Sequence, residues 1–283
     1  MVKIENLKKE FDRLKRGKEA LLNLIDESEL AESIYNSNAI ENSTLTLKET
    51  EKIIMEMEVS RDVSLREVYE AKNLFRVFEF IKNLNERPEL SKDFILLLHK
   101  ILMDNINDKI SGRFRNTNEY VRVGTHIGAN PNKLDKLIDD ILLEYSSDNS
   151  TYFLDKIAKF HLKFESIHPF NDGNGRIGRL LINLQLLVLG FPHIIVKNKE
   201  KIKYYMAFND YNDAGRFKLM SKLLNQALSE SLYKRLTYLK GFKIITLSEH
   251  SKIKKLSGSS IFNAAKRQSI PAFREKGVWK IGV

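Results

Sequence analysis

The sequence predicts a mainly helical protein with one small β-hairpin and a small C-terminal module. Apolar residues recur every three or four positions in stretches such as "LREVYEAKNLFRVFEFIKNL" and "YFLDKIAKFHLKFESI", which is the spacing of amphipathic helices. Alternating apolar residues are confined to short runs. The 283 residues are 42% hydrophobic and 30% charged, so the chain has enough apolar surface for a substantial core, and a disordered protein is excluded.

The domain organisation must be inferred from changes of pattern, because the chain has no Pro- or Gly-rich linker and no internal repeat. We expect an N-terminal helical segment over residues 1–60, a helical core over 61–238 and a C-terminal module over 239–283. Within the first segment, "TLKE" at 46–49 has the spacing of a capping box, so a helix should begin there.

Composition excludes several classes of protein. The chain has no cysteine, so it can form neither disulfides nor thiolate metal sites, which favours a reducing, cytoplasmic location. The N-terminus lacks the uninterrupted apolar core of a signal peptide. The longest apolar tract, "LLINLQLLVLGF", contains Asn183 and Gln185 and is too short to span a bilayer. We therefore expect a soluble protein with no membrane partner.

The stretch "HPFNDGNGRIGR", residues 168–179, lies between two predicted helices. The first should end at His168, because Pro169 disfavours helical dihedral angles at the residue before it. The second, "RIGRLLINLQLLVLG", is apolar almost all round, as in a helix buried inside a domain. The turn between them directs the backbone N–H groups of Gly173, Asn174 and Gly175 to a helix N-terminus, which favours binding of an anion.

The charged residues of this stretch indicate a polyphosphate site. Arg176 and Arg179 oppose the dipole of the helix that they begin, which makes better sense if a multiply charged anion binds between them. Asp172 supplies a hard carboxylate for Mg²⁺. His168, one turn away, could accept a proton from an attacking hydroxyl. Together these groups suit transfer of a nucleotide's phosphorus centre.

The same stretch closely resembles the signature of the Fic family, H-P-F-x-[D/E]-G-N-G-R-x-x-R, and every fixed position is present. The resemblance implies that His168 is the general base, Asp172 the Mg²⁺ ligand and Gly173 to Gly175 the phosphate nest, with Arg176 and Arg179 holding the phosphates of ATP. Most members with the full motif attach AMP from ATP to a Ser, Thr or Tyr of a target protein and release pyrophosphate.

Two alternatives stay open beside AMP transfer. The same fold could transfer another phosphate-containing group or remove AMP from a target protein. The chain could also be a non-enzymatic regulator that binds nucleotide and associates with DNA, although the complete motif argues against this alternative.

Two flanking segments extend the resemblance. In "YVRVGTHIGANPNKL" the spacing of Val121, Val123 and Ile127 predicts a small hairpin, and the resemblance implies that it is the flap that holds a target segment by strand addition. The segment "KYYMAFNDYN" is similar to one that contacts adenine in the family, which implies nucleotide-binding roles for Tyr205 and Asn212.

A second motif, "SNAIEN" at residues 37–42, resembles the inhibitory pattern [S/T]-x-x-x-E-[G/N] of the family. Ser37 and Glu41 are four residues apart and would share one helix face. The resemblance implies regulatory roles for Ser37, Glu41 and Asn42, with Glu41 paired to Arg179 in place of the γ-phosphate. ATP would then bind with its α-phosphorus misaligned, so the resting enzyme would be autoinhibited. The family also often forms dimers, which implies a possible homodimer.

The C-terminal region carries most of the excess positive charge, with eight Lys or Arg against one acid in residues 251–283. We expect a helix from about Ser259 and a hairpin that turns at Lys276 and Gly277, with Trp279 and Ile281 alternating. This arrangement resembles the winged helix-turn-helix of excisionase-like modules, which implies DNA binding through residues 240–283. Docking on the core or on a protein partner is the open alternative.

Overall fold

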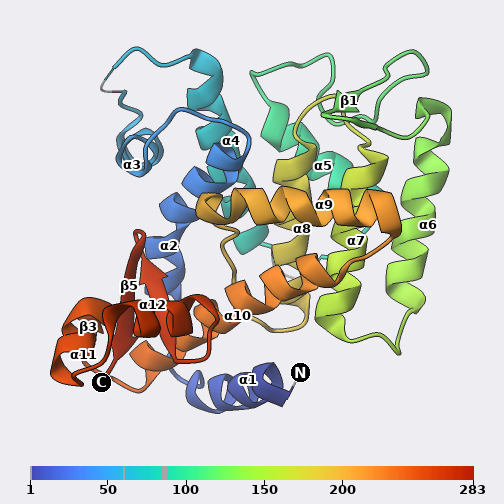
Figure 1. Cartoon of the computed structure of the whole chain (residues 1–283). Helices are drawn as coiled ribbons and strands as arrows, with labels where there is room; N and C mark the ends of the chain where they lie inside the picture. Colours follow the sequence, from blue (N-terminus) through green and yellow to red (C-terminus); the bar gives the residue numbers. More distant parts are fainter. Residues whose placement is uncertain (1, 60, 85–87) are drawn as a thin grey trace.

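The computed structural model describes residues 2–59, 61–84 and 88–283, and it confirms a mainly helical fold (Figure 1). The α-helices are α1 (Val2–Leu14), α2 (Glu19–Ile40), α3 (Leu47–Glu56), α4 (Leu65–Lys82), α5 (Lys92–Met103), α6 (Leu134–Ser147), α7 (Phe153–Ile167), α8 (Asn174–Val188), α9 (Lys201–Ala214), α10 (Lys218–Leu239), α11 (Leu247–Ile253) and α12 (Gly258–Lys266). The 3₁₀ helices are η1 (Pro131–Lys133) and η2 (Asn198–Glu200).

The strands form two small antiparallel sheets. They are β1 (Arg122–Val123), β2 (His126–Ile127), β3 (Ile244–Thr246), β4 (Ala272–Glu275) and β5 (Val278–Gly282). Strands β1 and β2 pair with each other and turn at Gly124 and Thr125, so the predicted hairpin is confirmed. The other sheet has the order β3-β5-β4 and belongs to the C-terminal module.

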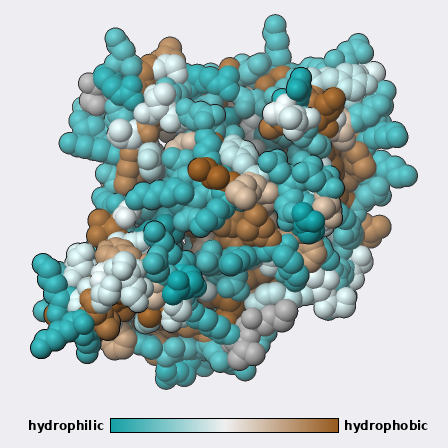
Figure 2. Space-filling view, viewed as in Figure 1, coloured by the Kyte–Doolittle hydropathy of each residue, from teal (hydrophilic) through white to brown (hydrophobic). Residues whose placement is uncertain are grey.

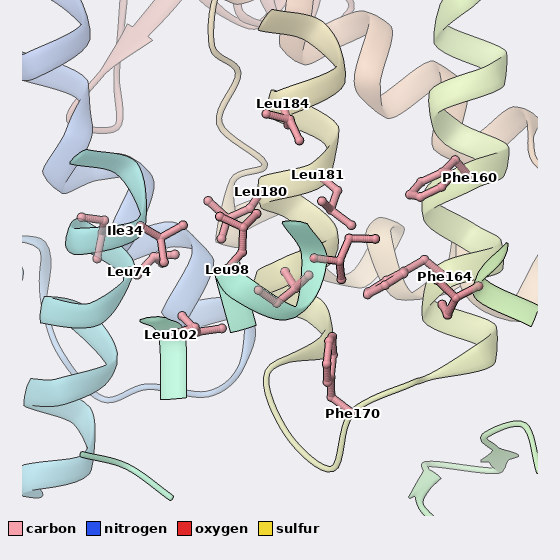
Figure 3. Packing of buried hydrophobic residues seen from close by; sticks show 14 of the residues in the cluster. Ile34, Leu74, Leu98, Leu102, Phe160, Phe164, Phe170, Leu180, Leu181 and Leu184 are labelled. Atoms are coloured by element: carbon pink, nitrogen blue, oxygen red, sulfur yellow. The ribbon is translucent and has the colours of Figure 1, made fainter. Parts of the chain in front are cut away.

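Helices α7 and α8 are the centre of the fold, because both of the larger hydrophobic clusters include their side chains. Figure 3 shows one cluster, in which Phe164 of α7 and Leu181 of α8 pack near Leu98 of α5. The other cluster joins the two helices to α1, α9 and α10. The prediction of a buried helix after the motif is therefore confirmed: Leu181 and Ile182, which point in different directions around α8, are both 0% exposed.

The capping box predicted at 46–49 is also confirmed. The Thr46 side chain accepts a hydrogen bond from the Glu49 backbone N–H at 3.2 Å, and the Glu49 carboxylate accepts one from the Thr46 N–H at 2.7 Å. This box begins α3 directly after the turn that ends α2. The turn, with Glu41 as the C-terminal cap of α2, is thereby held between two helices.

The predicted N-terminal segment packs as part of the helical body. Ile34 and Leu45 belong to one of the two large clusters, and Ile4 and Phe11 belong to the other. The boundary predicted at residue 60 lies outside the described residues and stays a prediction.

The C-terminal module has a small core of its own, made by Leu247, Ile261, Ala265, Ala272 and Ile281. Helix α12 and the hairpin turn at Lys276 and Gly277 lie where the sequence predicted them. The hairpin contacts the rest of the chain, because Arg274 Nη2 bonds Glu230 of α10 at 2.7 Å and the Lys276 backbone N–H bonds Glu32 of α2 at 3.0 Å. Within the described ranges no helix combines the length and apolarity needed to cross a membrane.

Candidate active site

The loop between α7 and α8 brings the residues of the "HPFNDGNGRIGR" stretch together. His168 follows the last residue of α7 with a φ of 52°, and Gly173 precedes α8 with a φ of 81°, a backbone conformation that glycine adopts without strain. Phe170, fully buried between them, stacks on His99 with ring centroids 3.7 Å apart. The Asn174 side chain bonds the Phe170 N–H at 2.9 Å and its carbonyl at 2.8 Å. These contacts fix the loop as a rigid base for the site.

Arg179 is buried and bonded entirely to protein groups. Its Nη2 donates to Glu41 Oε1 at 2.8 Å and to the Ser37 carbonyl at 2.8 Å, and its Nε donates to the Ser37 hydroxyl at 3.0 Å. Arg179 is 5% exposed, whereas the Glu41 side chain is 35% exposed. The carboxylate therefore lies at the open end of this contact, where solvent or a ligand can reach it.

The Glu41 carboxylate also lies over the first turn of α8. A Cβ built on Gly175 would overlap Glu41 Oε1, so only a glycine allows this close approach. The first turn of a helix is where exposed N–H groups attract an anion. An acidic side chain thus occupies the place that the sequence predicted for phosphate.

His168 is half-buried, and its neutral form is favoured. Burial is the main reason that its pKa is lowered to about 4. Its Nδ1 lies 3.3 Å from the Glu165 carbonyl, which can only accept, so Nδ1 carries the proton in this contact. The lone pair is then on Nε2, which is the state of a histidine ready to accept a proton.

Asp172 and Arg176 form an ionic cluster beside the loop. Burial alone would raise the pKa of Asp172, but the Arg176 and Arg66 cations lower it below its ordinary value. Arg176 Nη2 donates to Asp172 at 3.0 Å, Arg176 Nη1 forms an ion pair with Glu70 at 3.1 Å, and Arg66 bonds the other Asp172 oxygen. Across the described residues no group of three or more His, Asp or Glu side chains could hold a metal by itself. A cation here would need ligands from a bound phosphate as well.

The other predicted site residues are less closely connected. Tyr205 donates from its hydroxyl to the carbonyl of Ile40, which lies within the "SNAIEN" stretch, at 3.2 Å. Asn42 has a φ of 70° and accepts from Lys201 at 2.7 Å. Asn212 is exposed near the end of α9, and in the part of the chain that the structure describes no hydrogen bond joins it to the other site residues.

The hairpin lies beside the His168 loop. Val123 is 45% exposed and Ile127 is 65% exposed, while Val121, just before β1, is half-buried and its carbonyl accepts from Gly128 at 3.1 Å. The Ala129 N–H donates to the Ile167 carbonyl at 3.0 Å, which attaches the hairpin to the end of α7. The two exposed apolar side chains therefore belong to a hairpin that is attached to the residue before His168, and their role as a target-binding flap stays a prediction.

Sequence reasoning missed several polar residues that support the site. Arg115 bonds four backbone carbonyls around His168. His99 accepts from Gly112 through Nδ1 at 3.1 Å and so donates to the Asp172 carbonyl through Nε2 at 3.0 Å. Glu165 is protonated at neutral pH, because burial raises its pKa to about 8. The only signal in the sequence was a polar residue at a buried helical position or beside the motif, which does not reveal its partner.

Comparison with known protein families matches the part of the chain that contains the His168 loop. The model of the Fic/DOC family matches residues 89–186. The chain is 31% identical over 215 residues to protein adenylyltransferase fic-1 of Caenorhabditis elegans, which covers 74% of this chain and 41% of that protein. It is 30% identical over 184 residues to protein adenylyltransferase Fic of Nematostella vectensis, covering 63% of this chain and 42% of the relative. The chain thus spans about two fifths of the length of these relatives.

Solved structures agree with the sequence comparison. A Fic domain containing signaling protein from Bacteroides thetaiotaomicron has a TM-score of 0.76 at 26% identity, over 84% of this chain and 97% of that one. C. elegans Fic-1 has a TM-score of 0.71 at 25% identity, over 83% of this chain and 69% of that one.

Proposed function

Because this chain contains a Fic domain, we propose that it is a protein adenylyltransferase and that the arrangement described above is its self-inhibited form. The reaction would transfer AMP from ATP to a Ser, Thr or Tyr hydroxyl of a target protein, or of the enzyme itself. The observation that carries the proposal is the Glu41 carboxylate, which lies on Arg179 and over the first turn of α8 beside a neutral His168.

In the proposed mechanism, the hydroxyl oxygen attacks the α-phosphorus of ATP and His168 Nε2 takes its proton. The bond from the α-phosphorus to the bridging oxygen of the β-phosphate breaks, and pyrophosphate leaves. The N–H groups at the start of α8 and the two arginines stabilise the charge on the phosphates. Glu41 must leave Arg179 first, since the γ-phosphate needs the same guanidinium.

Mg²⁺ fits the donor set of the site as a cation that arrives with ATP. Asp172 presents a carboxylate whose pKa is lowered by two arginines, and a lone carboxylate with phosphate oxygens is a common way of holding Mg²⁺. Bound there, the cation would neutralise phosphate charge. Arg66 and Arg176, which now bond Asp172, would then be free to turn toward the phosphates.

The proposed reaction predicts which phosphorus of ATP is incorporated. The Glu41→Gly protein, incubated with Mg²⁺ and a cell lysate, should transfer label from α-labelled ATP and none from γ-labelled ATP. Mass spectrometry of the labelled protein should find an added AMP on a hydroxyl side chain. Incorporation of label from the γ position alone would show that the protein phosphorylates its target and does not transfer AMP. Incorporation from neither position would favour the alternative function of a non-enzymatic regulator. Loss of AMP from a pre-labelled target during incubation would instead indicate AMP removal.

A second proposal concerns the C-terminal module, for which we infer duplex DNA as a partner. Of the eight Lys and Arg side chains in residues 251–283, three form ion pairs: Arg274 with Glu230, Lys276 with Glu51 and Lys280 with Glu275. The other five are exposed and form no ion pair with any described residue; they are Lys252, Lys254, Lys255, Lys266 and Arg267. Hydrophilic side chains gather along the outer edge of this module, at the lower left of Figure 2. This surface is suited to the DNA backbone.

We expect the full chain to bind duplex DNA at low salt, with an affinity that falls as salt is raised. Substitution of Lys254 and Lys255 together by Gln should weaken binding and reduce the salt dependence, because two phosphate contacts are lost. The matched control replaces the exposed Lys48 and Lys136 of the helical body by Gln and should bind as wild type. If the chain does not bind DNA even at low salt, the remaining role of the module is docking on the core or on a protein partner.

The homodimer implied by the resemblance also stays a prediction, which light scattering tests.

A further inference from the structure

Arg115 lies behind the His168 loop, in a position that the proposed mechanism does not use. The residue is 3% exposed and comes from the segment after α5, far in sequence from the motif. It forms no ion pair with any described carboxylate, although buried arginines usually have one. Its guanidinium is instead satisfied by backbone carbonyl groups.

The contacts of Arg115 join three parts of the site. Nε donates to the His168 carbonyl at 2.8 Å, and Nη2 donates to the Ile167 carbonyl at 3.3 Å. Nη1 donates to the Glu119 carbonyl at 2.7 Å, and Nη2 also donates to the Ala129 carbonyl at 2.7 Å. Glu119 and Ala129 are on either side of the β1-β2 hairpin. The planar guanidinium group of Arg115 therefore holds the backbone at both ends of the hairpin and the backbone of His168.

From these contacts we propose that Arg115 is a positioning residue, which fixes the distance and orientation between His168 and the flap. The inference rests on the proposed function, because it assigns His168 as the base and the hairpin as the binding site of the target segment. A target hydroxyl held by the flap must meet His168 Nε2 and the α-phosphorus at once. Small errors in such alignment reduce rates strongly. Lysine could not replace Arg115, because a point charge cannot bond four carbonyls arranged around a planar fork.

The charge of Arg115 also acts on His168. Burial is the largest cause of the lowered His168 pKa, and the Arg115 cation lowers it further. Two other titratable groups also act on the imidazole: Glu41 at the end of α2, which raises the His168 pKa, and His126 of β2, which lowers it. Loss of the Arg115 charge should therefore raise the His168 pKa. Because the base must be neutral, the acid limb of the rate profile would move to higher pH.

The test compares Arg115→Gln, Arg115→Lys and Arg113→Gln, each in the Glu41→Gly background, by the pH dependence of AMP transfer. Arg113 is the matched control, since it bonds Glu119 at 2.7 Å and 2.8 Å in the same segment but does not touch the His168 loop. We expect Arg115→Gln to lower kcat by about 10²-fold and to move the acid limb to higher pH, with little change in KM for ATP. Arg115→Lys should lose rate but keep the acid limb. Titration of ATP itself is common to all variants and cancels in the comparison.

Each outcome separates the two proposals. An inactive Glu41→Gly reference would count against the proposed function and leave Arg115 to be judged by NMR titration of the His168 ring, which should show a raised pKa in Arg115→Gln. An active reference with an unchanged kcat and acid limb in Arg115→Gln would overturn the inference. So would equal effects in Arg113→Gln. If thermal melting shows that Arg115→Gln does not fold, Arg115→Lys decides: a kcat equal to that of the reference would overturn the proposal.

Discussion

Replacement of Glu41 by glycine is expected to raise auto-modification with α-labelled ATP and Mg²⁺ by about 10²-fold or more over the wild-type chain. In the resting form, Glu41 Oε1 bonds Arg179 at 2.8 Å and lies over Gly175. Under the proposed autoinhibition, the carboxylate would keep the γ-phosphate of a triphosphate from this place and would hold the α-phosphorus out of line with the incoming hydroxyl. Glycine removes the carboxylate and leaves Arg179 for the γ-phosphate.

The substitution should leave helix α2 intact, because Glu41 caps α2 rather than lying inside it, although the buried Arg179 loses the carboxylate that pairs with it and stability falls accordingly. The side chain is 35% exposed, so its removal leaves no internal cavity. A matched control is Glu27→Gly, which removes a carboxylate from α2 and adds a glycine to the helix but leaves the Glu41 contact in place. Among the described residues, Glu27 pairs only with the exposed Lys82, at 2.9 Å. We expect this control to remain as silent as wild type, and equal labelling of wild type and Glu41→Gly would contradict autoinhibition.

Replacement of Ser37 by alanine should release less of the inhibition than Glu41→Gly does, as measured by auto-modification with α-labelled ATP. This residue gives Arg179 both a hydroxyl and a carbonyl acceptor, at 3.0 Å and 2.8 Å. Only the first is lost in an alanine variant, so the arginine keeps its orientation. In the proposed mechanism the glutamate is therefore the part of the motif that would compete with nucleotide, whereas the serine would hold the guanidinium in place for either partner.

The local features of the fold follow from sequence, whereas its long-range contacts do not. Thr46 and Glu49 form a capping box because both partners lie within one turn, and the apolar periodicity of α8 matches its burial. Glu41 and Arg179 are 138 residues apart, and nothing in their spacing joins them. Their pairing was expected only because the two motifs resemble a known family.

Residue type was a weaker guide to what each side chain bonds. The backbone N–H of Asn174 is expected in the phosphate nest, which stays a prediction, but its residue type did not reveal that its side-chain amide closes the loop on the Phe170 backbone. Arg115 is in a basic stretch, "GRFR", that gives no sign of burial, and its partners are carbonyl groups brought together by the tertiary fold. Any buried polar residue must find a partner, but the sequence alone does not show which partner it finds.

Replacement of His168 by alanine in the Glu41→Gly background should abolish AMP transfer, with a loss of about 10²- to 10⁴-fold expected for removal of a general base. The Nδ1 contact with the Glu165 carbonyl, at 3.3 Å, orients the ring so that Nε2 is free. Alanine cannot take the hydroxyl proton, while the anion site around Arg179 is untouched. Nucleotide binding measured by calorimetry should therefore be nearly unchanged, which separates loss of chemistry from loss of the site. His250→Ala, in the C-terminal module, is the control for loss of a histidine elsewhere.

The pH dependence gives a second check on the same histidine. Its pKa is lowered to about 4, chiefly by burial, so the neutral base is already dominant well below pH 7. Activity of Glu41→Gly should thus stay level as pH falls from 8 through the ordinary range of histidine and decline only at more acidic values. A free histidine would lose activity near its unperturbed pKa of about 6.5. If label incorporation survived in His168→Ala with the same pH profile, the proton would have to go to another group, and His168 would not be the base.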